Sequence, residues 1–429
     1  MANLLEQIQK QQKNGTLFYA EQSMSVNDLV EKALKIRQRH PQLRGKKVAL
    51  TDRHLVDFLV SLIAFDGFCS AMYLCASNVT IPLVDGLQVW PLNGQDVSNS
   101  QMLPLVSNTR WYLATSGTTG EPKWFAHTLI SLTAETKHSA RLQKLCWALM
   151  YQACRFAGLQ VVLQALLSGA DLVDATGGEP LSQLALMQKN KVTAVSATPS
   201  LWRQLLMTKQ LPDLALSHIT LGGEIVDQTL LDQLARLFPQ AKVRHIYAST
   251  EAGVGFVVSD GKAGFPLSWL HNSELPLALK ISSEHHLLVK PNKQAKVPSN
   301  ITTDELGFMD TQDKVQVVAD RVVFLGRATG AINVGGNKVY PEKVEQVLLT
   351  IADVSQARVY AKNNPLMGQL VVADIVLFDN SELAKLDIAS MRRQVTHMCK
   401  NQLQRFEIPT KITVVEHMAH NVNGKLNRQ

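Results

Sequence analysis

The sequence has few cysteines, and they are not arranged in pairs. The five cysteines are Cys69, Cys75, Cys146, Cys154 and Cys399, and no two of them have the C-x-x-C spacing. An odd, scattered set argues against a disulfide framework or a thiolate metal site and is typical of a reducing compartment. We therefore expect a cytoplasmic protein. His417 and His420 lack further ligand spacing, and we interpret them as surface histidines.

Long apolar runs and blocks of one charge are also missing. No apolar run approaches the about 18 to 20 residues that span a bilayer, and the N-terminal residues do not resemble a signal peptide. The net charge of +7 is mild for 429 residues, and no Lys/Arg block suggests nucleic-acid binding. We expect no membrane or nucleic-acid partner. A hydrophobic content of 46% is typical of a globular protein, and the length predicts two or three domains.

The first 250 residues alternate between apolar strand candidates and amphipathic helix candidates, which predicts an α/β fold with parallel pairing. The expected strands are 47–51, 172–173, 192–196 and 219–221, and the expected helices are 26–36, 54–65, 180–189 and 225–238.

The pattern changes after about residue 255, where short strand candidates alternate with turns and predict a β-rich lobe. A smaller α+β unit follows Gly326-Arg327, with a helix from Pro341 and another over 381–404. We therefore predict a large domain over 1–326, built of parallel α/β subdomains plus the β-rich lobe, and a small mobile domain over 327–429.

The strongest local signal is a loop of small hydroxyl residues and glycines after an apolar strand. Its residues are Thr115, Ser116, Gly117, Thr118, Thr119 and Gly120, followed by Glu121-Pro122-Lys123. Such residues allow consecutive backbone N–H groups to face one anion, and hydroxyls and a lysine add donors. The loop predicts a phosphate cradle, although it lacks the Walker spacing. A flexible surface loop is the alternative.

This loop resembles the signature of the adenylate-forming superfamily, which includes acyl- and aryl-CoA synthetases, luciferases and peptide-synthetase adenylation domains. Two later segments resemble the G-G-E and Y-G-x-T-E motifs of that family; they are Gly222-Gly223-Glu224 and Tyr247-Ala248-Ser249-Thr250-Glu251. The resemblance implies that these motifs bind the nucleotide, with Tyr247 near the adenine, Thr250 at phosphate and Glu251 on Mg²⁺. A carboxylate suits this hard cation. Taken alone, Thr250-Glu251 could be a helix cap.

Two further segments resemble nucleotide-binding motifs of the family. Thr302-Thr303-Asp304 resembles T-G-D, which implies that Asp304 accepts the ribose hydroxyls, although Thr303 replaces the glycine. Phe324-Leu325-Gly326-Arg327 resembles F-L-G-R, which implies that Arg327 contacts ribose or phosphate. The hinge would lie just beyond it, at Thr329.

The C-terminal part carries two more resemblances. The turn at Gly335-Gly336 resembles one that lines the thiol tunnel, and 423–428 resembles G-K-x-x-R, which implies that Lys425 catalyses adenylation. The resemblance covers Tyr112 to Arg428. It implies an AMP-forming acid–thiol ligase that uses ATP, Mg²⁺ and the thiol of CoA or of a phosphopantetheinyl carrier protein, with rotation of the small domain between two half-reactions.

The identity of the acid is less well defined by the sequence. His127, Arg155 and Ala248 are candidate pocket residues; a pocket-facing Arg155 would favour a second carboxylate or electron-rich oxygen, and the alternative is an arginine turned to solvent or salt-bridged. The compact N-terminal part is similar to aryl-acid ligases, so we expect a small aromatic acid. The pocket segment lacks the aspartate that would hold an amino group. Amino-acid or fatty-acid loading of a carrier, and a degenerate nucleotide-binding protein, are the alternatives.

Overall fold

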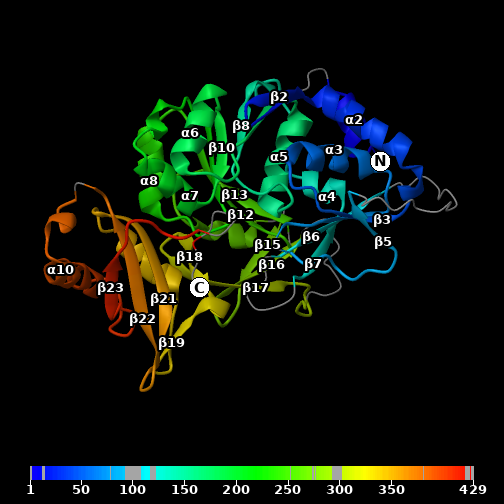
Figure 1. Ribbon diagram of the computed structural model, residues 1–429. Coiled ribbons are helices and arrows are strands. Elements are labelled where there is room, and N and C mark those ends of the chain that lie inside the picture. The colour runs from blue at the N-terminus through cyan, green and yellow to red at the C-terminus, as the bar shows by residue number, and fades with distance from the viewer. Residues whose placement is uncertain are drawn as a thin grey trace.

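The computed structural model describes residues 2–11, 15–77, 79–91, 108–115, 122–251, 253–272, 275, 277–291, 302–379, 381–420 and 426. It has four sheets, of which three belong to the larger part of the molecule and one lies beside them with its own helices (Figure 1). Within the described ranges, no helix is both long and apolar enough to span a membrane.

An eight-stranded sheet forms the centre of the large part, and its inner strands are parallel. Its order is β13 (Gly253–Val258), β12 (Lys242–Ser249), β11 (His218–Gly222), β10 (Ala194–Ala197), β8 (Cys146–Leu149), β9 (Asp171–Asp174), β1 (Thr16–Tyr19) and β2 (Gln22–Ser25). Only the edge strands β13 and β2 pair antiparallel. Helices on both faces bury strands such as β8 and β11, which explains the continuous apolar sequence of β8 and the burial of nearly all of β11.

A five-stranded sheet lies next to the first. Its order is β5 (Leu87–Trp90), β3 (Lys47–Leu50), β4 (Ala71–Leu74), β6 (Arg110–Ala114) and β7 (Trp124–His127). The first four strands are parallel, and β7 turns back antiparallel to β6. The predicted phosphate loop therefore connects the two strands of a hairpin.

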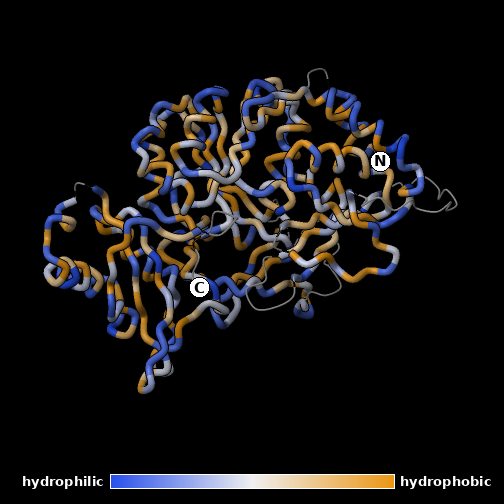
Figure 2. The backbone as a smooth tube through the Cα atoms, in the orientation of Figure 1, coloured by the Kyte–Doolittle hydropathy of each residue, from blue (hydrophilic) through white to orange (hydrophobic). Residues whose placement is uncertain are grey.

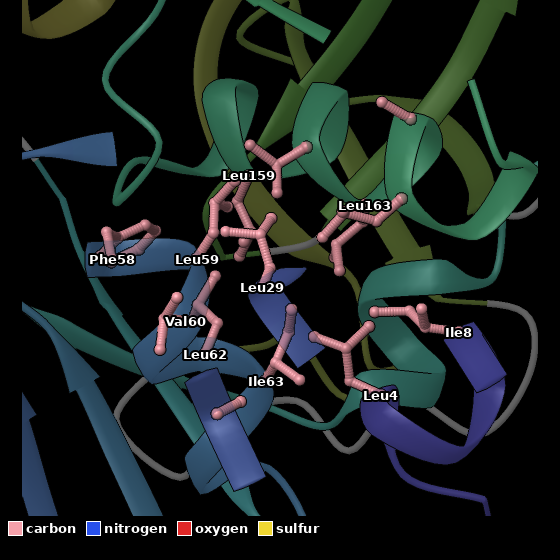
Figure 3. Packing of buried hydrophobic residues seen from close by; sticks show 14 of the residues in the cluster. Leu4, Ile8, Leu29, Phe58, Leu59, Val60, Leu62, Ile63, Leu159 and Leu163 are labelled. Carbon is pink, nitrogen blue, oxygen red and sulfur yellow. The ribbon is translucent and has the colours of Figure 1, made fainter. Parts of the chain in front are cut away.

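Helices fill the space between these two sheets. α1 (Leu4–Gln9), α2 (Val26–Arg39), α3 (Leu55–Phe65) and α5 (Phe156–Ser168) pack together around a shared apolar cluster, shown in Figure 3. α3 is buried over nearly its whole length, whereas α2 exposes a polar face and begins with a capping box of Ser25 and Asp28. The outer helices show mixed hydropathy in Figure 2 because they bury only one face.

Three helices cover the other half of the central sheet, and a short helix follows β7. They are α6 (Pro180–Lys189), α7 (Pro199–Met207), α8 (Gln228–Leu237) and α4 (Leu129–Thr133). α8 begins three residues later than predicted because the Asp227 side chain caps it by accepting the Leu230 N–H. Single 3₁₀ turns lie at Pro41–Leu43, Leu142–Lys144, Leu211–Asp213, Leu267–His271, Ala328–Gly330 and Leu383–Lys385.

The predicted β-rich lobe is a five-stranded antiparallel sheet. Its order is β14 (Phe265–Pro266), β18 (Arg321–Arg327), β17 (Met309–Val318), β16 (His286–Pro291) and β15 (Leu277–Ile281). Aromatic side chains fill its core, where Phe256 contacts Phe265 and Trp269. β12 and β13 of the central sheet run into this core, so the lobe meets the central sheet at Tyr247.

The C-terminal unit has a separate sheet and a separate apolar core. Its elements are β19 (Ile332–Val334), β20 (Asn337–Val339), α9 (Pro341–Leu349), β21 (Val354–Asn364), β22 (Gly368–Leu377), α10 (Ile388–Lys400) and β23 (Lys411–Val414). The helix predicted over 381–404 is wrong at both ends. α10 starts only at Ile388 because the Asp387 carboxylate accepts the Ala389 and Ser390 N–H groups. The α/β fold class is confirmed.

Candidate active site

The β6–β7 hairpin brings the two ends of the predicted phosphate loop together. The Thr115 N–H donates to the Lys123 carbonyl at 2.9 Å, one step beyond the last strand pair. Tyr112 on β6 stacks on Tyr73 at 4.3 Å, and Trp124 on β7 meets the same Tyr73 edge-on. The loop residues Ser116, Gly117, Thr118, Thr119 and Gly120 lie outside the described residues.

Arg155 lies under this hairpin. It is the residue before α5, and only 9% of its surface is exposed. Its Nη1 donates to the Ala114 carbonyl at 3.3 Å, at the end of β6. Burial lowers the pKa of the guanidinium. Gly158, the third residue of α5, leaves room for the Gln152 backbone, because a Cβ there would lie 2.2 Å from the Gln152 carbonyl oxygen. Arg155 is therefore not turned to solvent, whereas the salt-bridged alternative stays open.

His127 connects the loop hairpin to the Thr250-Glu251 segment. Its Nε2 lies 2.8 Å from the Thr250 carbonyl oxygen, which can only accept, so Nε2 carries the proton. Burial lowers the pKa of His127, and the nearby Glu251 carboxylate opposes that effect. Two segments 123 residues apart in sequence thus meet at one point, as the predicted site requires.

Tyr247 stands where the central sheet meets the β-rich lobe. Its ring stacks on Phe256 at 5.0 Å and on Phe324 at 5.4 Å, nearly parallel to both. Tyr247 thus belongs to the aromatic cluster of the β-rich lobe, and its expected place near the adenine stays a prediction. Its hydroxyl donates to Asp313 Oδ2 at 2.7 Å. The strand shifts register between Tyr247 and Ala248, and Ala248 pairs with Val254.

Asp313 is the site residue that the sequence analysis missed. It follows Thr311 and Gln312 on β17, and Arg327 Nε lies 3.3 Å from its Oδ1. Arg327 Nη2 also donates to the Thr311 carbonyl at 3.0 Å. The pKa of Asp313 is raised mainly by burial and also by the nearby Glu251, whereas Arg327 and Tyr247 oppose the rise. Asp313 is thus close to Tyr247, Arg327 and Glu251.

The residue between Thr311 and Asp313 has an unusual backbone. Gln312 has a φ of 61°, in the left-handed region that glycine adopts most easily. The segment Thr311-Gln312-Asp313 therefore has, at its middle position, a backbone conformation that a glycine would favour. The signal available in the sequence was a second Thr-x-Asp spacing, closer to Arg327.

Asp304, which we expected at the ribose, has the contacts of a turn residue. Its Oδ1 accepts the Leu306 N–H at 3.0 Å and the Phe308 N–H at 2.8 Å, and the residue is exposed. An Asp side chain that bonds the backbone two residues on is typical of a turn. The structure does not join Asp304 to Tyr247 and Arg327.

Glu224 joins three parts of the chain. β11 ends at Gly222, and the next residue, Gly223, has a φ of 82°. Glu224 comes directly after this glycine pair. Its Oε2 accepts the Ser200 N–H at 3.0 Å, and its Oε1 accepts the Leu426 N–H at 3.1 Å. Leu426 is the residue after Lys425, which lies outside the described residues.

Two described residues near the C-terminus, His420 and Leu426, contact the large part of the molecule. His420 is half-buried, with Nδ1 at 2.9 Å from Gln204 Nε2, so the prediction of a surface histidine is wrong there. It is right for His417, which is exposed. His420 is less exposed than predicted because it lies against α7, and this burial lowers the pKa of its imidazole.

The Gly335-Gly336 turn lies within the C-terminal unit. Both glycines have positive φ, 55° and 90°, as a two-residue hairpin between β19 and β20 requires. A Cβ at Gly335 would lie 2.6 Å from Met367 Cε, and the Gly335 N–H donates to the Met367 carbonyl. The turn is therefore well defined by glycine and by its contact with Met367.

No group of three or more His, Cys, Asp or Glu side chains that could hold a metal occurs among the residues that the structure describes. A magnesium ion on a nucleotide needs only one or two carboxylates because phosphates and water complete its shell. The single carboxylate of Glu251, close to His127 and Asp313, fits that donor set.

Comparison with known proteins gives consistent results. The AMP-binding enzyme family matches residues 91–275, and the AMP-binding enzyme C-terminal domain matches residues 343–425. VraA of Staphylococcus epidermidis, which is named as a long chain fatty acid-CoA ligase by proposal, is 22% identical to this chain. The match covers 96% of this chain and 93% of VraA. The 2-succinylbenzoate–CoA ligase of Bacillus velezensis is 25% identical over 86% of this chain and 76% of its own.

A solved structure shares the fold over nearly the whole length. The anthranilate CoA ligase AuaEII in complex with anthranoyl-AMP has a TM-score of 0.75 and 15% identity, over 99% of this chain and 95% of its own. The chain therefore belongs to the AMP-binding, adenylate-forming superfamily, in its class of AMP-forming acid–thiol ligases. The chemistry of that class is ATP-dependent adenylation of a carboxylic acid followed by thioester formation.

Proposed function

We propose that this protein activates a small aromatic carboxylic acid with ATP and Mg²⁺ and transfers the acyl group to the thiol of CoA or of a phosphopantetheinyl carrier protein. The observation that carries the proposal is the meeting of three segments. The loop hairpin reaches Thr250 through His127, the Glu251 carboxylate contributes to the raised pKa of Asp313, and Glu224 accepts the N–H of the residue after Lys425.

In the first half-reaction, a carboxylate oxygen of the acid attacks the α-phosphorus of ATP, and pyrophosphate leaves. Negative charge develops on phosphate oxygens, so the site must supply positioned donors and cations. We assign the phosphates to the Thr115–Lys123 loop and Thr250, and the α-phosphate and acid oxygen to Lys425. Glu251 would hold Mg²⁺, which neutralises phosphate charge when bound.

The nucleoside end of the site is assigned to Asp313 in place of Asp304. An ionised carboxylate accepts two hydroxyl hydrogen bonds, and Asp313 lies between a donor, Tyr247, and the cation Arg327. The Arg327 side chain is 63% exposed, so it can turn toward ribose or phosphate at little cost. We assign Tyr247 to orienting Asp313, with Gly222 and Gly223 beside the nucleotide.

In the second half-reaction, the thiolate sulfur attacks the acyl carbon, and AMP leaves with the bonding pair. One site cannot easily hold Lys425 and the thiol together, so we propose that the domain over 327–429 rotates on the domain over 1–326. Thr329 is the proposed pivot; it lines a polar groove between the two units with Gln312 and Lys338. The rotation would present Gly335 and Gly336 to the thiol.

The aromatic class of the acid rests on the pocket neighbours and on the relatives. His127, Arg155 and Ala248 are the proposed pocket residues, and the Phe156 ring lies 5.9 Å from the His127 ring. One relative is named for 2-succinylbenzoate, and the solved relative holds an anthranoyl group. Arg155 donates to the Ala114 carbonyl at the end of β6, and we propose that it also contacts a polar substituent on the acid.

The test is acid-dependent exchange of labelled pyrophosphate into ATP with benzoates, cinnamates, dicarboxylates, fatty acids and amino acids. We expect the highest rate with a benzoate that carries a polar substituent, and a smaller preference in Arg155→Met. A fatty acid or amino acid as the best substrate would overturn the aromatic assignment. Silence across the panel with ATP still bound would favour a degenerate protein. Thioester formation with CoA or a purified carrier then identifies the thiol.

A further inference from the structure

Glu224 follows a glycine pair that the family resemblance assigns to nucleotide binding, yet its two carboxylate oxygens bond two distant protein segments. One oxygen accepts an N–H from the start of α7, and the other accepts the N–H of Leu426. We propose that Glu224 is a positioning residue that holds the segment bearing Lys425 against the large domain during adenylation. This proposal rests on the proposed role of Lys425.

The first support is covalent geometry. Leu426 directly follows Lys425, and consecutive Cα atoms across a trans peptide are about 3.8 Å apart. Fixing the Leu426 N–H at 3.1 Å from Glu224 therefore restricts the backbone that carries the Lys425 side chain. The bond links positions 202 residues apart in the sequence.

The second support is that the same segment docks at other points on α7. His420 forms an antiparallel bridge with Leu426, and its Nδ1 lies 2.9 Å from Gln204 Nε2. Met418, two residues earlier, is buried. Ser200 and Gln204 both belong to α7, so His420 contacts this helix directly, and Leu426 contacts Glu224, which lies at the N-terminal end of the same helix.

The third support is that the Glu224 side of the contact is rigid. Trp202 on α7 is fully buried, and its Nε1–H donates to the Thr220 carbonyl of β11 at 3.0 Å. Arg203 and Asp227 form a 2.6 Å ion pair with both side chains largely buried, which connects α7 to the start of α8. These contacts fix the segment between β11 and α8, which contains Glu224.

The hydrogen bond between Glu224 and the Leu426 N–H can hold the C-terminal segment and can also break when that segment moves. A carboxylate that accepts backbone N–H groups makes charge-assisted hydrogen bonds, and the N-terminus of α7 favours its negative charge. Of the two Glu224 bonds seen among the described residues, the one to Leu426 crosses to the C-terminal segment. It can break when that segment leaves, together with the His420–Gln204 contact, while the Ser200 bond keeps Glu224 in place. The arrangement provides a docking point specific to the adenylating state.

The experiment compares the two half-reactions in the full-length protein. Glu224→Gln keeps the shape but turns an NH₂ group toward one of two N–H donors. Single-turnover acyl-AMP formation, with the best acid from the exchange panel, is expected to fall about 10- to 30-fold. Thiolysis of preformed acyl-AMP should change less than about twofold, with unchanged ATP affinity, because the proposed contact serves only the adenylating state.

A reciprocal pair of variants tests the same bond from the other side. Leu426→Pro removes the N–H and leaves Glu224 intact, whereas Leu426→Ala keeps the N–H and is the matched control. We expect Leu426→Pro to resemble Glu224→Gln, Leu426→Ala to lose less, and Glu224→Gln/Leu426→Pro to be no worse than the single variants. Equal losses in both half-reactions, or a weakened ATP affinity, would overturn the proposal in favour of a structural or nucleotide-binding Glu224.

Amide hydrogen exchange separates this inference from the proposed function. In Glu224→Gln without ligands, peptides covering 415–429 should exchange faster, while peptides of the antiparallel lobe stay unchanged. This result is expected even if no acid supports pyrophosphate exchange, an outcome that would refute the proposed function alone. Unchanged exchange in 415–429 would overturn the role of Glu224 whatever the substrate.

Discussion

Two short stretches of the β-rich lobe have the same Thr-x-Asp pattern but different roles. Asp304 is exposed, and its carboxylate closes its own turn by accepting the N–H groups of Leu306 and Phe308. Asp313 is mostly buried and bonds two residues from other strands, Tyr247 and Arg327. Because only one of the two aspartates has long-range partners, local sequence is a poor guide to which one serves the nucleotide.

The backbone conformation of the residue before each aspartate also differs between the two stretches. Gln312 adopts a left-handed conformation that a glycine would favour, whereas Thr303 forms an antiparallel bridge with Met309. Burial also separates the pair, since it raises the pKa of Asp313. The backbone conformation and the contacts of a motif therefore identify it better than its amino-acid sequence does.

The largest expected effect on activity comes from replacing Asp313 by asparagine, and the same change at Asp304 is the matched control. Asp313→Asn removes the ionised acceptor, and we expect kcat/KM for ATP in pyrophosphate exchange to fall about 100-fold, or about 2.7 kcal/mol. Asp304→Asn should change it less than about twofold, because its carboxylate serves only a turn. A reversed order of the two variants would return the ribose assignment to Asp304.

Tyr247→Phe should give a smaller effect with a pH signature. Its hydroxyl lowers the pKa of Asp313, so removing it raises that pKa further. Asp313 must be ionised to accept two hydroxyls, so the acidic limb of the kcat/KM profile for ATP should move to higher pH by about 0.5 to 1 unit, with about a 10-fold loss at neutral pH. An unmoved acidic limb would separate the Tyr247 hydroxyl from nucleotide binding.

The backbone contrast predicts a difference in stability. Gln312→Val places a β-branched residue in a left-handed conformation and should lower the free energy of unfolding by about 1 to 2 kcal/mol. Thr303→Val, in extended pairing, should stay within about 0.5 kcal/mol. Thermal unfolding of both variants measures the difference, and similar Tm values would show that residue 312 carries no such strain.

The smallest effect is expected at the turn. Asp304→Ala leaves two turn N–H groups without their side-chain acceptor and should cost about 1 kcal/mol of stability. Pyrophosphate exchange should stay unchanged within error. A loss of exchange larger than the loss of Tm explains would give Asp304 a part in the reaction.

Much of the fold could be predicted from the sequence because parallel strands are buried on both faces and read as apolar runs. The strands at 194–197 and 218–222 and the separate C-terminal core are examples. Other features depend on long-range contacts. β1 joins the central sheet through Leu17 and Leu172, and nothing near Leu17 in the sequence indicates that partner. The start of α10 was missed because a local cap, Asp387, overrides the longer periodic pattern.

The site shows the same division. The hairpin at Thr115 and Lys123 and the Thr250-Glu251 turn follow from local motifs, and the structure brings them together through His127. Glu224 and Asp313 depend on partners more than 60 residues away, Leu426 for one and Tyr247 for the other. Side-chain partners of that kind cannot be read from spacing in a single sequence.

The most direct test of the account is the binding of a stable mimic of an aroyl-AMP, a benzoyl-sulfamoyl adenosine, measured by calorimetry. We predict tight binding to the unaltered protein and to Asp304→Asn, and binding weaker by about 50-fold or more to Asp313→Asn. Equal affinity of Asp313→Asn and the unaltered protein, or no binding to the unaltered protein at all, would contradict an adenylate site built around Asp313, Tyr247 and Arg327.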